Sequence, residues 1–202
     1  MKKPEGYDQT TAQGEFTPVE LGGHYAVIKQ VTERESSTGK EMIVVVFDFA
    51  PEDAQAGYFS TSFKNNTRED KKWPFNGTKY IMVMDYNDPN KTSRAFKTFC
   101  SCAEKSNNFE IKWGVSNWAK QFAGKKIGVV FGEEENEYEG RITMRRVPKW
   151  FCKWDAVDGA SIPTPKFISG DRRAAAKPSN SYTTDNDGFM VLPDEADEEI
   201  PF

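Results

Sequence analysis

The sequence predicts a mainly β domain over residues 21–160, preceded by a flexible segment at 1–20 and followed by a disordered linker and acidic tail at 161–202. Two observations favour this division. Apolar segments with strand-like spacing recur along the middle of the chain, and nothing periodic follows them. The whole chain is only 37% hydrophobic, which is low for a protein folded throughout, so part of it is expected to stay unfolded.

Five segments are predicted as strands because they are rich in β-branched and aromatic residues and are bounded by turn residues. They are residues 22–33, 42–49, 78–86, 125–131 and 141–147. The second segment, MIVVVFDF, is apolar almost throughout, which is typical of a buried central strand. Residues 132–140 are predicted to connect the last two strands, and Pro148 is predicted to end the fifth.

Alternation along the first strand predicts two faces. Tyr25, Val27 and Val31 are assigned to one face, and Ala26 and Ile28 are assigned to the other. A turn at 36–39 then joins this strand to the second, so that the two form a hairpin.

One longer segment, residues 90–105, has helical spacing. Its apolar positions follow the i, i+3, i+4, i+7 pattern and are Phe96, Phe99, Cys100 and Ala103. Asn90 or Thr92 is available as its N-cap, and a second short helix is predicted at 117–122. The connection at 51–77 is long for a compact domain, which favours a functional loop, and a short helix is predicted to start within 51–56.

The order of these elements is three strands, a helix and two strands. This order favours an OB-fold, a five-stranded Greek-key barrel with its helix between strands 3 and 4. A generic α+β domain with five strands is the alternative. The predicted fold class is therefore mainly β, with an OB-type barrel and a disordered acidic tail.

The negative charge is concentrated at the end of the chain. The formal net charge is −4 overall, but residues 171–202 contain eight acidic and three basic residues, a net of −5. Residues 1–170 therefore contain 24 basic and 23 acidic residues, a net of +1. Because the acidity is local to the tail, it does not exclude an anionic ligand for the domain.

The chain ends in an acidic run closed by three apolar residues. The residues predicted to bind partner proteins are Asp194, Glu195, Asp197, Glu198, Glu199, Ile200, Pro201 and Phe202. A shallow apolar pocket rimmed by Arg or Lys would accept the Phe202 ring beside its free carboxylate, and Pro201 would lower the ordering cost. The alternative is a solvating acidic tail that ends by chance in an apolar tripeptide.

This ending resembles the C-terminal tip of bacterial single-stranded DNA-binding proteins, and the rest of the chain is more similar to such proteins encoded by phages and prophages. The resemblance implies a homo-oligomer that coats single-stranded DNA in replication, recombination or repair. It also implies that the tip recruits replication, recombination or repair proteins. The protein is then expected in the cytoplasm of a bacterial or phage-infected cell.

Binding of single strands without sequence preference needs a basic groove for the backbone and aromatic faces for the bases. The predicted DNA-binding residues supply both kinds of side chain and are Lys64, Arg68, Lys71, Lys72, Trp73, Lys79, Tyr80, Arg94, Arg141, Arg145, Lys149 and Trp150. On the fifth strand, alternation predicts Ile142 and Met144 in the core and the two arginines on a basic face.

Several of these aromatic residues have a structural alternative. Trp73 precedes a proline and is a candidate plug for the barrel end. Tyr80 and Tyr86 share the parity of Met82 and Met84, so the alternative for them is a core position. Two further aromatic residues, Trp113 and Trp118, are expected in the core rather than in base stacking.

The cysteine and histidine content limits the chemistry. Cys100, Cys102 and Cys152 are expected to be reduced thiols of a cytoplasmic protein. The single histidine, His24, supplies neither a zinc-ligand set nor a nucleophile pair, so we expect no metal, no cofactor and no enzymatic activity. We also expect no secretory signal and no membrane association.

Three alternative functions stay open at this point. The domain could be an adaptor that binds only proteins, a mediator that anneals single strands, or a nuclease that uses its carboxylates with a metal ion. Steep salt dependence would distinguish DNA coating from a protein contact. An annealing assay and incubation of labelled strands with Mg²⁺ or Mn²⁺ would test the other two.

Overall fold

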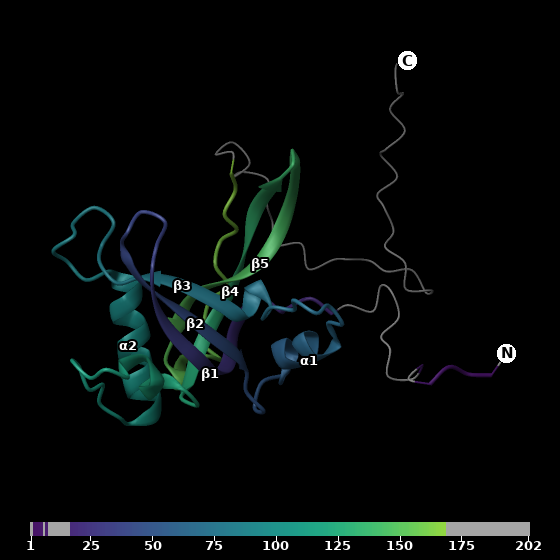
Figure 1. Cartoon of the computed structure of the whole chain (residues 1–202), viewed down its shortest axis with the longest axis horizontal. Coiled ribbons are helices and arrows are strands. Elements are labelled where there is room, and N and C mark those ends of the chain that lie inside the picture. Colours follow the sequence, from purple (N-terminus) through teal and green to yellow (C-terminus); the bar gives the residue numbers. More distant parts are fainter. Residues whose placement is uncertain (1, 6, 8–16, 169–202) are drawn as a thin grey trace, which may run out of the picture. The chain divides into compact units, whose positions relative to one another are not determined.

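The computed structural model describes residues 2–5, 7 and 17–168. Residues Val19–Ile168 form one compact unit, which Figure 1 shows as a sheet with α2 and α1 on different sides. Residues 1–18 and 169–202 fall in a separate unit, in which the Lys3 ammonium lies 5.2 Å from the centre of the Tyr7 ring.

The compact unit contains five strands and two α-helices. In chain order they are β1 (Gly22–Glu35), β2 (Glu41–Phe49), α1 (Tyr58–Asn65), β3 (Thr78–Met82), α2 (Arg94–Asn107), β4 (Lys126–Tyr138) and β5 (Arg141–Cys152). Three short 3₁₀ helices, η2 (Phe75–Gly77), η3 (Trp118–Phe122) and η4 (Trp154–Ala156), lie in the connections. The helix predicted at 117–122 is thus a 3₁₀ turn.

The strands form one antiparallel sheet in the order β3-β2-β1-β4-β5. β3 and β5 are its two edges. They approach each other at one point, where the ammonium of Lys79 on β3 donates a 2.7 Å hydrogen bond to the carbonyl oxygen of Pro148 on β5. The prediction of a mainly β domain is confirmed, with a five-stranded antiparallel sheet as its frame.

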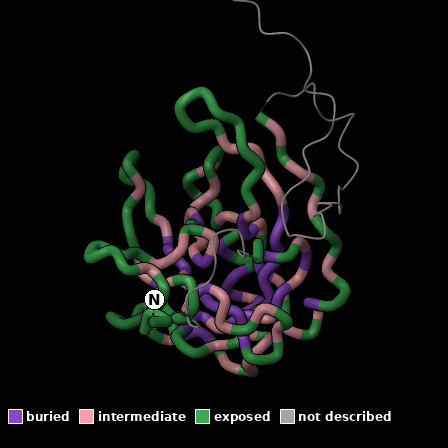
Figure 2. The backbone as a smooth tube through the Cα atoms, turned by 90° about the vertical axis from the view of Figure 1, so that its right-hand side faces the viewer, coloured by how far each residue is buried: buried purple, intermediate pink, exposed green. Residues whose placement is uncertain are grey.

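The core combines residues of the sheet and of α2, and Figure 2 shows the buried residues gathered at the centre of the domain. Ile28, Val45, Phe47 and Val129 are completely buried sheet residues. From α2, the core receives the residues predicted from helical spacing, Phe96, Phe99, Cys100 and Ala103. Full burial of a large apolar side chain stabilises a domain by about 1.5–3 kcal/mol, so this cluster fixes where α2 packs.

The N-cap of α2 is Ser93 and not Asn90 or Thr92. Its hydroxyl oxygen accepts a 3.1 Å hydrogen bond from the backbone N–H of Phe96 and donates to the carbonyl oxygen of Met82. The second bond ties the helix start to the end of β3, which explains why the cap lies later than predicted.

The face assignment along β1 is wrong beyond Ile28. A β-bulge at Lys29 shifts the register between Ile28 and Gln30. Val31 therefore faces the core together with Ala26 and Ile28, and not with Tyr25 as predicted. An extra residue at a bulge reverses the alternation that follows it.

The prediction for the end of the sheet also needs correction. β4 continues to Tyr138 and β5 starts at Arg141, so residues 132–138 are strand and not loop. Glu139 and Gly140 make the turn, with φ values of 50° and 74° that are typical of a type I′ hairpin. Pro148 does not end β5, because it lies beside a bulge opposite Phe131, where proline is tolerated.

The β4–β5 hairpin projects as an arm, which Figure 1 shows extending past the other strands. Ile142 and Met144 lie on this arm and are exposed, so their predicted core position is wrong. They alternate with polar residues as in a half-buried strand, but no other element among the described residues packs over them.

The compact unit extends past the predicted boundary at residue 160. The backbone of Lys166 pairs with β4, donating to the carbonyl oxygen of Glu133 at 3.1 Å and accepting from the N–H of Glu135 at 2.8 Å. The preceding segment packs on Gly23 and Gly132, where a Cβ would lie 3.0 Å or less from Ala160 and Pro163. Residues 161–168 therefore belong with the domain and not with the linker.

Helix α1 begins at Tyr58 and not within 51–56, because its N-terminus is capped from β2. The buried Asp48 carboxylate accepts hydrogen bonds from the backbone N–H groups of Phe59 and Ser60, at 3.0 and 3.3 Å. The Ser60 hydroxyl donates to the same carboxylate. A strand residue distant in sequence thus decides where the helix starts.

The start of β1 is fixed by a buried histidine–carboxylate pair. The Nδ1 atom of His24 lies 3.2 Å from the Asp53 carboxylate, and its Nε2 atom lies 3.0 Å from the carbonyl oxygen of Glu20. Both partners are acceptors, so each ring nitrogen is placed to donate. Burial raises the pKa of Asp53, but hydrogen bonds from His24 and from the N–H groups of Gln55 and Tyr25 outweigh it, and the pKa lies below its ordinary value.

Candidate nucleic-acid interface

The outward positions of β1, β2 and β3 form a continuous surface, which we call the three-strand face. Cross-strand partners in an antiparallel sheet point to the same side. The nine positions form three rows, Arg34–Met42–Met82, Thr32–Val44–Tyr80 and Gln30–Val46–Thr78. The residues that alternate with them, such as Ile43, Val45 and Ile81, are buried in the core.

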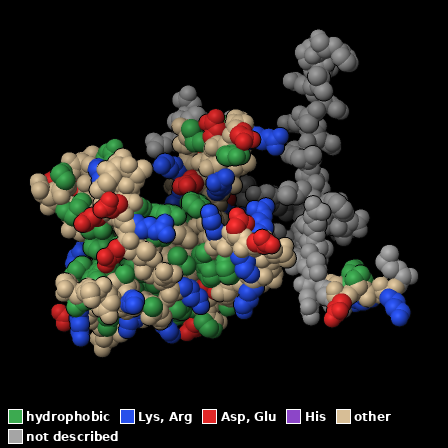
Figure 3. All heavy atoms as spheres, in the orientation of Figure 1, with side chains coloured by type: hydrophobic (Ala, Val, Ile, Leu, Met, Phe, Trp, Pro, Cys, Tyr) green, Lys and Arg blue, Asp and Glu red, His purple; other side chains and the backbone are tan. Residues whose placement is uncertain are grey.

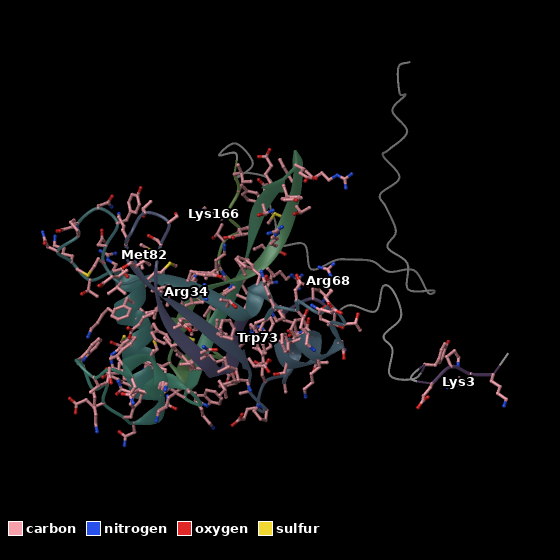
Figure 4. All side chains as sticks on the ribbon, viewed as in Figure 1. Lys3, Arg34, Arg68, Trp73, Met82 and Lys166 are labelled. Carbon is pink, nitrogen blue, oxygen red and sulfur yellow. The ribbon has the colours of Figure 1, made fainter. Side chains whose placement is uncertain are left out.

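Tyr80 occupies the middle row of the three-strand face and is 50% exposed. Arg34 and Met82 belong to the adjacent row, and Figure 4 shows both of their side chains on this part of the sheet. A half-exposed tyrosine, with a methionine in the next row on β3 and an arginine in that row on β1, offers a flat ring, an adaptable apolar contact and a cation on one face. This is the combination on which an unpaired base and its phosphate can be held.

A second aromatic residue continues this surface beyond β3. Tyr86 is exposed, and the Lys40 ammonium lies 4.2 Å from the centre of its ring. The same ammonium donates to the Tyr86 carbonyl oxygen at 3.4 Å. The β1–β2 turn therefore places a cation over a ring next to the three-strand face. Both tyrosines are exposed, so the core alternative for them is wrong.

Five of the predicted DNA-binding residues lie together in the segment that leads into β3, which we call the basic segment (residues 64–73). Four are exposed cations, Lys64, Arg68, Lys71 and Lys72, and the fifth is Trp73. Glu69 and Asp70 reduce the net charge of the segment to +2. Figure 3 shows Lys and Arg side chains recurring over this view of the domain, with Asp and Glu between them.

Trp73 is anchored rather than free. Its indole N–H donates a 3.1 Å hydrogen bond to the carbonyl oxygen of Gly77, and its ring packs 5.7 Å from the ring of Phe63. The Lys71 ammonium lies 5.0 Å from the centre of the Phe63 ring. Figure 4 shows Trp73 and Arg68 on this segment. Trp73 thus fixes the basic segment against the domain, which agrees with its structural alternative.

Two predicted DNA-binding lysines are engaged inside the domain. Besides the bond from Lys79 to Pro148, the Lys149 ammonium lies 2.8 Å from the Glu134 carboxylate. Burial lowers the pKa of Lys79, and the nearby Lys149 cation lowers it further. Lys79 joins the two edges of the sheet and Lys149 joins β5 to the neighbouring β4, so neither belongs to the three-strand face.

The remaining predicted DNA-binding residues are scattered over other elements. Arg141 and Arg145 are exposed on the arm, Trp150 is exposed at the base of β5, and Arg94 begins α2. The structure therefore brings Tyr80 and the basic segment together through β3, but it does not gather these four beside them.

Arg34, Met82 and Lys40 are candidate site residues that the sequence analysis missed. Gln30, Thr32 and Arg34 are polar and alternate with the buried Val31, which is a signal for an outward face. The bulge at Lys29 hid this signal, because alternation counted from Ile28 places Arg34 on the wrong side.

The predicted partner-binding residues, Asp194 to Phe202, lie outside the described residues. Within the described ranges, no group of three or more His, Cys, Asp or Glu side chains is placed to hold a metal ion. No helix among them is long and apolar enough to cross a bilayer. No protein-family model and no curated protein matches this chain.

Proposed function

We propose that this chain is a single-stranded DNA-binding protein built on an OB-fold. The strand order β3-β2-β1-β4-β5 supports the fold, as do the approach of β3 to β5 and the position of α2 between β3 and β4. OB-folds bind oligonucleotides on the face of strands 2 and 3 and on the loops that join strands 1–2 and 4–5. The three-strand face and Lys40 occupy the first two of these positions.

The observation that carries the proposal is Tyr80, a half-exposed ring in the middle row of an outward sheet face, on the edge strand β3 beside the buried Val44. A base stacked on such a ring contributes about 1–3 kcal/mol and needs no particular sequence. Arg34 in the adjacent row, Lys40 in the β1–β2 turn and the basic segment before β3 supply the charge that a phosphate backbone requires. The acidic tip at Asp194–Phe202 then recruits replication, recombination or repair proteins to the coated strand.

The test is a titration of fluorescent oligo-dT, and of a duplex of equal length, against the full chain at two salt concentrations. We expect tight binding of oligo-dT, weak binding of the duplex, and a clear loss of affinity at the higher salt. Tyr80→Ala should lower the oligo-dT affinity by about 5- to 100-fold, which is the cost of one stacked base.

The matched control is Tyr7→Ala, because Tyr7 is also exposed but lies outside the compact unit that carries the three-strand face. It should leave the affinity within about twofold of the parent, as expected for a surface substitution away from the site. Equal losses for the two variants, or no loss for Tyr80→Ala, would contradict the assignment of this face.

A further inference from the structure

A second surface begins where β1 and β2 extend past the core. Cross-strand pairing sets Glu33 opposite Ile43 and Glu35 opposite Glu41. Ile43 faces the core, so these three glutamates occupy positions that would face inward if the core continued. On this interior side of the β1–β2 hairpin, where apolar side chains are expected, the chain has three exposed carboxylates.

These carboxylates line a groove of about 640 Å³ together with Phe96, Trp113 and Trp118. We call it the carboxylate groove. The three rings form one cluster, in which Trp113 and Trp118 stack at 5.6 Å and Phe96 and Trp118 stack at 5.8 Å. The groove thus combines an aromatic floor with an acidic rim.

Trp113 is 61% exposed, so the expectation that it belongs to the core is wrong, whereas Trp118 is 8% exposed and is in the core as expected. The buried indole N–H of Trp118 is a hydrogen-bond donor without an acceptor in the described part of the chain. Buried donors in folded proteins are nearly always paired. The exposed Trp113 ring that stacks on Trp118 leaves an aromatic face open for a bound side chain.

The charges around the groove decide what it can bind. Among the described residues, none of Glu33, Glu35 and Glu41 forms an ion pair, and Glu35 and Glu41 repel each other across the hairpin. Arg34 also lines the groove, so its charged lining has a net charge of −2. This charge disfavours a phosphate backbone and favours a cation, which an exposed tryptophan face also attracts.

We propose that the carboxylate groove binds a basic, apolar peptide segment of a partner protein. A Lys or Arg of that segment lies on the Trp113 ring between the carboxylates. A neighbouring aliphatic side chain enters the apolar floor between Ile43 and Phe96. This site is separate from the acidic tip, because the two attract segments of opposite charge.

The probe for this proposal is a fluorescein-labelled, end-blocked hexapeptide of alternating Lys and Leu, titrated against the full chain and followed by anisotropy. A hexapeptide of alternating Glu and Leu is the control ligand. We expect the Lys peptide to bind, the Glu peptide to fail, and the Lys peptide to bind more weakly as salt rises.

The triple variant Glu33→Gln, Glu35→Gln, Glu41→Gln should lower the affinity for the Lys peptide by about tenfold, given the strength of exposed ion pairs. Trp113→Ala should lower it by about fivefold through loss of the cation–ring contact. The matched control is Glu137→Gln with Glu139→Gln, which removes exposed carboxylates from the arm and should change the affinity by less than about twofold. Thermal unfolding of each variant checks that it is folded.

The same variants separate this site from the DNA surface. We expect oligo-dT not to displace the Lys peptide, and the triple variant to keep its oligo-dT affinity or exceed that of the parent. If the Lys peptide does not bind, or binds the triple variant equally well, the proposal is wrong. If oligo-dT displaces the peptide and Trp113→Ala weakens DNA binding as much as Tyr80→Ala does, the groove belongs to the nucleic-acid path instead.

Discussion

The three-strand face and the carboxylate groove differ in charge although consecutive residues of β1 build both. Arg34, Met42 and Met82 share an outward row, whereas Glu33 and Glu35 occupy positions on the interior side of the sheet, and Arg34 and Met42 also line the groove. Each surface also has an exposed ring, Tyr80 on one and Trp113 on the other. In these two proposals, the sign of the charge beside a ring, and not the ring itself, decides between an anionic and a cationic ligand.

The largest expected effect comes from placing one cation on each side of β1 in turn. Val31 faces the core and is 6% exposed, while its neighbour Thr32 lies on the three-strand face. Val31→Arg should destabilise the domain by about 3 kcal/mol or more, because it buries an unpaired charge. Thr32→Arg should leave stability within about 0.5 kcal/mol and raise the affinity for oligo-dT.

Chemical denaturation measures the first variant, and the oligo-dT titration measures the second. If the two variants lost equal stability, the face assignment along β1 would be wrong, and with it the separation of the two surfaces.

A smaller effect is expected at the opposite end of β1, where neither surface lies. Asp53→Asn should lower the free energy of unfolding at pH 7 by about 1–3 kcal/mol, because it weakens the acceptor for buried donors of His24 and Tyr25. Oligo-dT and Lys-peptide affinities of the folded variant should not change. Denaturation and the two titrations on one preparation check this.

The pH dependence of this contribution follows from the sign of the pKa shift. The pKa of Asp53 is below its ordinary value of 3.8, so its stabilising effect is present above that pH and is lost as pH falls through the lowered pKa. The stability difference between parent and Asp53→Asn should therefore shrink below about pH 4. A constant difference from pH 7 to pH 3 would argue against the pair.

The smallest effect on binding should come from removing residues 193–202. We propose that the acidic tip competes with DNA for the cationic surface, so its deletion should leave the oligo-dT affinity equal or raise it by up to a few-fold. The Lys-peptide affinity at the acidic groove should not rise, because the deleted segment has the wrong charge to occupy it. Recruitment of partner proteins, measured by pull-down from a bacterial lysate, should be abolished.

A deletion that removed most of the oligo-dT affinity would contradict a role of the tip in recruitment alone. It would also break the comparison, since the DNA site would then not be confined to the folded domain.

The sequence identified the five strands, the main helix and the core positions of α2, because these depend on local spacing. It did not locate the bulge at Lys29 or the length of the arm, since both depend on which strand pairs with which. The start of α1 was also missed, because it is set by Asp48, a residue of β2. Contacts between segments far apart in the chain cannot be predicted from the residue pattern of a short segment.

The candidate site was harder to predict than the fold, for a physical reason. Tyr80 and Met82 have the composition of a core face, because a surface that stacks bases is itself apolar. Lys79 has the composition of a binding residue, yet it points the other way and joins β3 to β5. Residue type therefore assigned the wrong side to Lys79 and left Tyr80 open between a binding and a core position, and the pairing of β3 with β2 resolves both.

The bond from Lys79 to Pro148 has a consequence for how this domain loses its structure. Among the described residues, β3 and β5 share no ladder of main-chain hydrogen bonds. The hydrogen bond between these two edge strands comes from the Lys79 side chain. Local unfolding starts where few bonds must break, and here it would release the edge that includes Tyr80. A DNA strand bound across β3 and β5 would hold both edge strands in place. The melting temperature of the domain would therefore rise with the concentration of that DNA.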